Sequence, residues 1–188
     1  NSLCCKGLIA KNEKNFLKKF HKWLTVGKSG DIIKTSQAGK GQMYSFNGRF
    51  NNRLDDKNRI RIPAKFKKDL GEDYKFAFGP GESIYVLPKA EYEKILAGFG
   101  DASFFDEDAQ NAIAQFTGMV YDVTEDNQGR VVIPAELKEY AKIDKDIVIT
   151  GAAAYLRIES AESFAAKNAN VSVSSVFAKL NALRGPKA

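Results

Sequence analysis

Residues 51–64, NNRLDDKNRIRIPA, combine a polar turn signal, four basic side chains and a proline that starts a helix. The same pattern of residue types recurs at residues 123–135, VTEDNQGRVVIPA. An offset of 71 residues aligns Asp55 with Asp126, Arg59 with Arg130, Pro63 with Pro134 and Ala64 with Ala135. Self-similarity at a fixed offset indicates that the chain contains two copies of one structural unit.

Each copy is predicted to contain short strands, a polar turn and short helices. After the turn comes a β-branched run, and then a helix that opens on proline at its first position. Further strands are predicted at 74–78, 83–87, 146–150 and 155–158, and helices at 89–97, 105–116, 161–167 and 173–183. The fold class is therefore α+β, mainly β with short helices. We expect helix 105–116 to pack with Phe105 and Phe116 on one stripe, and the last helix to dock on the chain or contact a partner.

The repeated aspartate and arginine have a physical explanation as a turn device. Each aspartate is expected to accept hydrogen bonds from backbone N–H groups of its turn and to pair with the arginine four residues later. The residue before the arginine is Asn58 or Gly129, which are residue types that tolerate a left-handed backbone. We therefore assign Asp55, Asp126 and Arg130 to a structural role, fixing the turn and the start of the helix.

Around this motif the two copies differ in charge. Where the first copy is basic the second is not: Arg53, Lys57, Arg61 and Lys65 align with Thr124, Gln128, Val132 and Glu136. A DNA-binding surface needs cations against phosphates and fork-shaped donors for guanine edges. Only the first copy has several such side chains close together in the sequence.

The distribution of charge leads to the same region. The chain carries a formal net charge of +6. Residues 1–42 hold nine lysines and two acidic residues, so residues 43–188 are nearly neutral. Within that body, residues 49–68 hold eight basic residues against two aspartates. The positive charge of the body is thus concentrated around the first motif.

Enzyme chemistry has little support. The chain has a single histidine, His21, and two adjacent cysteines, Cys4 and Cys5, all within the lysine-rich first segment. Nucleophilic and metal sites that depend on histidine therefore have no such residue in the body. We predict no catalytic residue, cofactor, metal or small-molecule substrate. Because no signal peptide or bilayer-length apolar run is evident, we expect a cytoplasmic protein without membrane contact.

Residues 1–42 differ from the rest of the chain. Residues 16–24 have the spacing of a short basic amphipathic helix, and residues 27–42 resemble a linker. We expect a mobile extension without a specific role. Contact with a membrane surface or with DNA, and translation from an upstream operator sequence, are the alternatives.

The stretches NGRFNNRLDDKNRIRIPAKF and DVTEDNQGRVVIPAELKEYA resemble the MraZ family of bacterial transcriptional regulators. The resemblance runs from about Met43 to the C-terminal helices. It implies two tandem AbrB-like swapped-hairpin units, residues 43–118 with a linking helix and 119–188 with a C-terminal helix, that form a pseudo-dimer within one chain. It also implies ring-shaped homo-oligomers, and binding of double-stranded DNA at short G-rich direct repeats upstream of a division and cell-wall operon.

The resemblance also bears on individual residues. It places the family's central DNA contact at Arg59, to which the local charge adds Arg53, Lys57 and Arg61. Asn58 departs from the glycine that is typical of the family at that position. We therefore expect a sequence-specific, nucleoid-associated DNA-binding regulator. The alternative is an oligomeric AbrB-like protein-interaction module without DNA binding, which the nearly neutral body would permit.

Overall fold

The structure, a computed structural model, describes residues 44–100 and 103–183 of the 188-residue chain. The described residues up to Ala169 belong to one compact unit, whereas the last helix belongs to a second unit and is described by itself. The predicted helix at 16–24, together with Cys4, Cys5 and His21, lies outside the described residues. Within the described part of the chain, no helix has both the length and the apolar composition needed to cross a bilayer.

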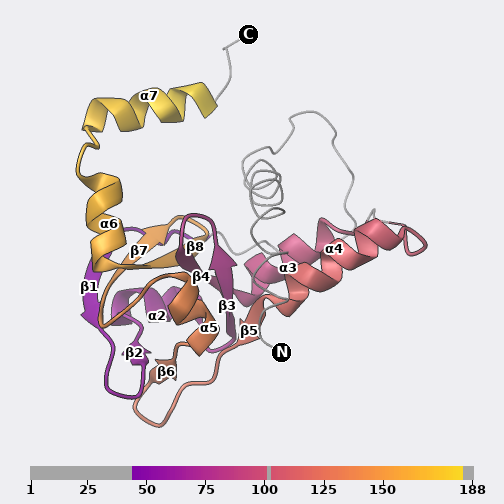
Figure 1. The fold of residues 1–188 in the computed structure, drawn as a ribbon, viewed down its shortest axis with the longest axis horizontal. Helices are drawn as coiled ribbons and strands as arrows, with labels where there is room; N and C mark the ends of the chain where they lie inside the picture. Colours follow the sequence, from indigo (N-terminus) through magenta and orange to yellow (C-terminus); the bar gives the residue numbers. More distant parts are fainter. Residues whose placement is uncertain (1–43, 101–102, 184–188) are drawn as a thin grey trace, which may run out of the picture. The chain divides into compact units, whose positions relative to one another are not determined.

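Along the described chain, pairs of strands are each followed by one or two short helices (Figure 1). The strands are β1 Arg49–Arg53, β2 Arg59–Arg61, β3 Tyr74–Gly79, β4 Ser83–Pro88, β5 Val120–Asp122, β6 Arg130–Val132, β7 Asp146–Ala152 and β8 Tyr155–Ser160. The helices are α2 Ala64–Leu70, α3 Lys89–Ala97, α4 Glu107–Gly118, α5 Ala135–Tyr140, α6 Ala161–Asn168 and α7 Val173–Leu183. The predicted α+β class is confirmed.

The two copies build one sheet together. Six antiparallel strands follow the order β1-β7-β8-β4-β3-β5, and β2 and β6 form a separate two-stranded ribbon. Thus β1 of the first copy pairs with β7 of the second, and β5 of the second pairs with β3 of the first. Each copy therefore makes part of its backbone hydrogen bonds with the other.

The main core lies between the sheet, the ribbon and the helices α2 and α5. Side chains alternate between the two faces of a strand, so that the ribbon turns Ile60 and Val131 inward, each 1% exposed. Phe66 of α2 and Leu137 of α5 join the same apolar cluster. Burial of these side chains fixes the ribbon against the sheet, and the loops before β2 and β6 are thereby brought to one end of this unit (Figure 1).

Two local predictions need correction. Pro63 and Pro134 take the N-cap position of α2 and α5 instead of the first helical position, with ψ of 135° and 140°. Their carbonyls still accept the first helical hydrogen bonds, from Lys67 N at 3.1 Å and Lys138 N at 3.0 Å. An extended ψ is normal at an N-cap, and the fixed φ of proline is compatible with it.

The helix between the copies starts later than predicted. Its N-cap is Asp106, whose carboxylate accepts a hydrogen bond from Ala109 N at 3.0 Å. Phe105 therefore precedes the helix and is 93% exposed, whereas Phe116 is buried and packs edge-on against Phe99. The predicted stripe is wrong at Phe105 because the helix begins only after its capping residue, Asp106.

The helix α7 is amphipathic, as the sequence predicts. Its apolar side chains fall at helical spacing and are exposed: Val173, Val176, Phe177 and Leu180. Docking of this helix on the chain and contact with a partner both remain open as predictions.

Candidate nucleic-acid interface

The loop before β2 is closed by Asp55. One carboxylate oxygen, Oδ1, accepts hydrogen bonds from Lys57 N and Arg59 N, both at 2.9 Å. The other, Oδ2, accepts from Arg59 Nε at 2.8 Å and lies 2.7 Å from Arg59 Nη2. Asn58 adopts a φ of 56°, the left-handed backbone that its residue type favours. The turn thus has the hydrogen bonds that the sequence predicts for it.

The loop before β6 repeats this arrangement. Asp126 Oδ1 accepts from Gln128 N at 2.9 Å and from Arg130 N at 3.0 Å. Its Oδ2 accepts from Arg130 Nε at 2.9 Å and lies 2.8 Å from Nη2. Gly129 has a φ of 69°, so the left-handed position is conserved between the two loops although the residue is different.

The two motifs also contact each other, which the sequence analysis did not predict. Arg59 Nη1 donates to Asp126 Oδ2 at 3.2 Å, and Arg130 Nη1 lies 3.9 Å from Asp55 Oδ2. We call these four residues the ion-pair cluster. Both arginine side chains are largely covered, with 20% and 28% exposed. The cluster gives Arg59 the structural role that the sequence analysis assigned to Arg130 alone.

The cluster holds its two carboxylates in the ionised form. Hydrogen bonds from the Arg59 side chain, then from the Arg59 backbone, lower the pKa of Asp55 to about 2. The side chain and backbone of Arg130 do the same for Asp126, whose pKa is also about 2. With two arginines and two ionised aspartates, the cluster is electrically neutral at physiological pH. The excess positive charge at this end must come from other residues.

Further bonds between the copies fix the loops in place. Lys138 Nζ of α5 donates to Asn58 Oδ1 at 2.7 Å, and Ile133 N donates to Asn58 O at 3.0 Å. Arg61 Nη2 donates to the backbone oxygen of Gln128 at 2.8 Å. Each loop is therefore held by the other copy as well as by its own aspartate.

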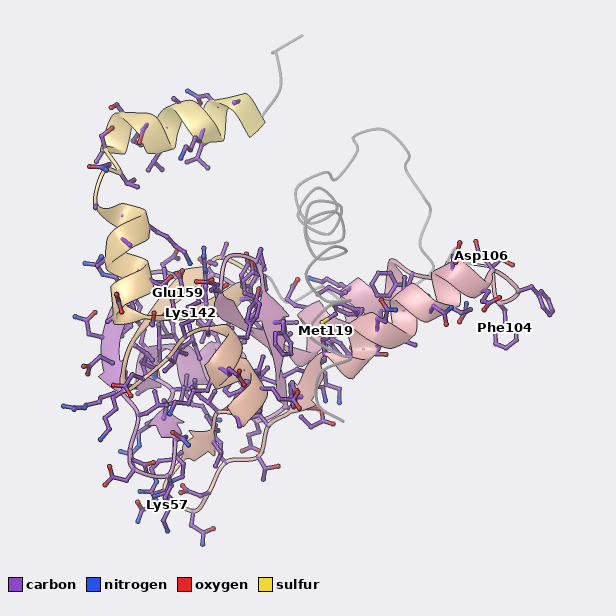
Figure 2. All side chains as sticks on the ribbon, in the orientation of Figure 1. Lys57, Phe104, Asp106, Met119, Lys142 and Glu159 are labelled. Carbon is purple, nitrogen blue, oxygen red and sulfur yellow. The ribbon has the colours of Figure 1, made fainter. Side chains whose placement is uncertain are left out.

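Four exposed cationic side chains lie at the positions where the copies diverge in charge, and we call them the basic set: Arg53, Lys57, Arg61 and Lys65. Arg53 ends β1 and lies 3.7 Å from Asp146, with both side chains 68% exposed. Lys57 projects from the tip of its loop (Figure 2). Arg61 is exposed on β2, and Lys65 of α2 donates to the backbone oxygen of Asn47 at 2.8 Å.

The predicted DNA contacts therefore fall into two groups. Arg59 lies inside the ion-pair cluster, whereas Arg53, Lys57 and Arg61 lie in exposed positions on the strands and the loop beside it. At the aligned positions of the second copy, Thr124 and Gln128 are exposed and uncharged. The charge difference predicted between the copies is thus a difference between exposed surfaces.

Sequence reasoning missed a second ionic contact between the copies. Glu125 accepts hydrogen bonds from Lys67 and from Tyr74 Oη, the latter at 2.7 Å. Burial opposes ionisation of this carboxylate, but these donors outweigh it and lower its pKa. Lys67 was counted with the basic surface of the first copy, yet its charge is compensated here. Its partner lies 58 residues away, and the aligned position in the first copy is Leu54, so repeat symmetry offered no signal.

No group of three or more histidine, cysteine, aspartate or glutamate side chains suited to a metal ion is present in residues 44–100 and 103–183. What the described residues bring together is a rigid, neutral pair of loops with exposed cations beside it.

Comparison with known proteins identifies relatives of both copies. The family model "MraZ protein, putative antitoxin-like" matches residues 45–114 and again residues 116–183. A protein of Carboxydothermus hydrogenoformans named "Transcriptional regulator MraZ" is 34% identical over 117 residues, which are 62% of this chain and 82% of the relative. One of Clostridium tetani with the same name is 33% identical over 139 residues, 73% of this chain and 98% of the relative.

Proposed function

The chain belongs to the MraZ family, and we propose on that premise that it binds double-stranded DNA and regulates transcription. Its relatives are named as transcriptional regulators, and membership in this family confirms the expectation that the chain is not an enzyme. DNA binding would place the protein at the nucleoid, in the cytoplasm.

The observation that carries the proposal is the exposure of the basic set beside two rigid loops. Phosphate contacts require cations that can approach the duplex. Lys57 at the loop tip satisfies this requirement, and Arg61 on β2 is exposed while its Nη2 is held by Gln128 O. The loops are preorganised by the ion-pair cluster, so binding orders little backbone. A rigid, cationic surface of this kind favours DNA over a protein partner held by apolar contacts.

For Arg59 we propose a double role. Its guanidinium faces Asp55 and Asp126, but Nη1 and Nη2 each carry a second N–H. Those donors can meet a base edge or a phosphate while the carboxylates hold the plane of the group in a fixed orientation. The aspartates would thus position the arginine that contacts DNA.

We further propose AbrB-like swapped-hairpin units, ring-shaped homo-oligomers and G-rich direct repeats as the target, upstream of a division and cell-wall operon. The pairing of β1 with β7 and of β5 with β3 supports an intrachain pseudo-dimer. A ring would present several weak contacts at once, and tandem DNA repeats would let them act through effective concentration.

The test is to select bound duplexes from a random-sequence pool with the full chain, and then to titrate the recovered duplex at increasing salt. We expect enrichment of a G-containing repeat and an affinity that falls steeply with salt. Light scattering on the same sample measures the oligomer. A pool without enrichment, or binding that does not respond to salt, would contradict DNA recognition and favour the protein-interaction module.

A further inference from the structure

We propose that Val132 determines part of the DNA sequence preference by contacting the C5-methyl group of a thymine. This inference rests on the proposed DNA-binding function. It extends the DNA contacts to a residue of the second copy, where the sequence analysis expected none.

The exposed face of the β2–β6 ribbon carries the argument. Ile60 pairs with Val131 at the centre of the ribbon, and both side chains point into the core. Because side chains alternate along a strand, the neighbouring residues on either side point outward. The outward face of the ribbon therefore comprises Arg59, Arg61, Arg130 and Val132.

Val132 is the apolar member of this face. It is 56% exposed, although valine is a residue type that is most often buried. Its cross-strand partner is Arg59, so the methyl groups stand beside the arginine for which a DNA contact is proposed. A two-stranded ribbon fits the major groove, where thymine alone presents a methyl group among the four bases. An exposed isopropyl group beside guanidinium groups is suited to that pattern.

The pairing of the ribbon adds a second argument. The repeat maps Arg61 onto Val132, and the two residues take equivalent positions on β2 and β6. An arginine fork prefers guanine O6 and N7, whereas an isopropyl group prefers an apolar base edge. The two ends of the ribbon therefore cannot recognise the same base. The element bound by one chain should be non-palindromic, with guanine towards Arg61 and thymine towards Val132.

The experiment uses the full chain and a duplex recovered from a random-sequence pool. Each thymine is replaced in turn by uracil, which removes only the C5-methyl group. We expect one replacement to weaken wild-type binding about three- to fivefold, the effect of one buried methyl group. Val132→Ala should lose a similar factor on the thymine duplex and should be indifferent to uracil at that position.

Controls separate this inference from the function on which it rests. Val171→Ala removes another exposed valine, one outside the ribbon, and should keep the full uracil penalty. Thermal melting of Val132→Ala should match wild type because the side chain is exposed. If Val132→Ala still binds the uracil duplex more weakly than the thymine duplex, the proposed contact is wrong. The same follows if wild type binds equally well with uracil at every position. Either result leaves the proposed DNA binding intact. A pool without any enrichment overturns both.

Discussion

Lys57 stands at the tip of the first loop and Gln128 at the equivalent place in the second, although the two loops share their hydrogen bonds and their left-handed residue. Asp55 and Asp126 each close a turn, pair with an arginine and have a pKa of about 2. The backbone is thus repeated while the exposed side chains are not.

This difference separates structure from recognition. An aspartate that accepts two backbone N–H groups and an arginine has used most of its hydrogen-bonding capacity, so the repeated residues hold the loops. We propose that DNA recognition rests mainly on the positions that diverge, the basic set in the first copy and Val132 in the second, with Arg59 as the one repeated residue that also contacts DNA. The predictions below test this separation, beginning with the largest expected effect.

Replacing the basic set with the aligned residues of the second copy should abolish strong DNA binding. The variant carries four substitutions: Arg53→Thr, Lys57→Gln, Arg61→Val and Lys65→Glu. If each cation neutralises one phosphate, the slope of log K against log salt becomes shallower by roughly three to four, and affinity falls on the order of 10²-fold. Salt titration measures this, and thermal melting reports separately the loss of the Arg61–Gln128 and Lys65–Asn47 hydrogen bonds. Lys142→Gln, which removes an exposed lysine outside both loops, is the control and should bind normally.

Removing either arginine of the ion-pair cluster should destabilise the protein. Arg59→Ala removes the main partner of Asp55 and one of the two partners of Asp126, and Arg130→Ala does the reverse, so each should lower the free energy of unfolding. In addition, Arg59→Ala should weaken DNA binding by about 1–3 kcal/mol per engaged subunit. Denaturant unfolding and DNA titration separate the two effects. Arg130→Ala with wild-type stability would show that the loops are not structurally equivalent.

The left-handed position should accept asparagine but not alanine. Gly129→Ala forces a Cβ into a φ of 69° and should cost about 1–2 kcal/mol in stability. Gly129→Asn should cost less, because Asn58 adopts a φ of 56° at the equivalent position. Thermal melting of the two variants compares them directly. Equal losses would mean that space at the loop, not backbone conformation, selects the residue.

Acid should weaken the ion-pair cluster within a defined window. Asp55 and Asp126 have their pKa lowered from 3.8 to about 2, so their ionised forms stabilise the folded state. That contribution is complete only above about pH 5 and is lost as pH falls through the unfolded value of 3.8 towards 2. Between pH 4 and 2, melting of wild type should decline more steeply than melting of the Asp55→Asn, Asp126→Asn double variant. Parallel profiles would contradict the lowered pKa values.

Much of the fold is readable from the sequence because local signals and the repeat agree. The strands 74–78 and 83–87, the turn geometry and most helix positions follow from residue types and spacing. The misplaced helix start at Phe105 shows that a capping aspartate outweighs an apolar stripe.

The candidate site was less predictable. Lys57 and Arg61 are exposed, as the charged character of their segment predicts. The contact of Arg59 with Asp126 spans 67 residues, and no local pattern encodes it. The pairing of Lys67 with Glu125 depends on β5 of the second copy pairing with β3 of the first, and it breaks the repeat symmetry. Such contacts require the three-dimensional arrangement.

Lysine acetylation of the wild-type full chain, with and without the selected duplex, tests most directly where DNA lies. Lys57 at the loop tip and Lys142, whose side chain is 68% exposed, are both accessible and are well separated in Figure 2. Mass spectrometry at low modification should show Lys57 and Lys65 shielded by bound DNA while Lys142 reacts as before. Equal modification of Lys57 in both samples, with Lys142 shielded instead, would contradict the assignment of DNA binding to the first copy.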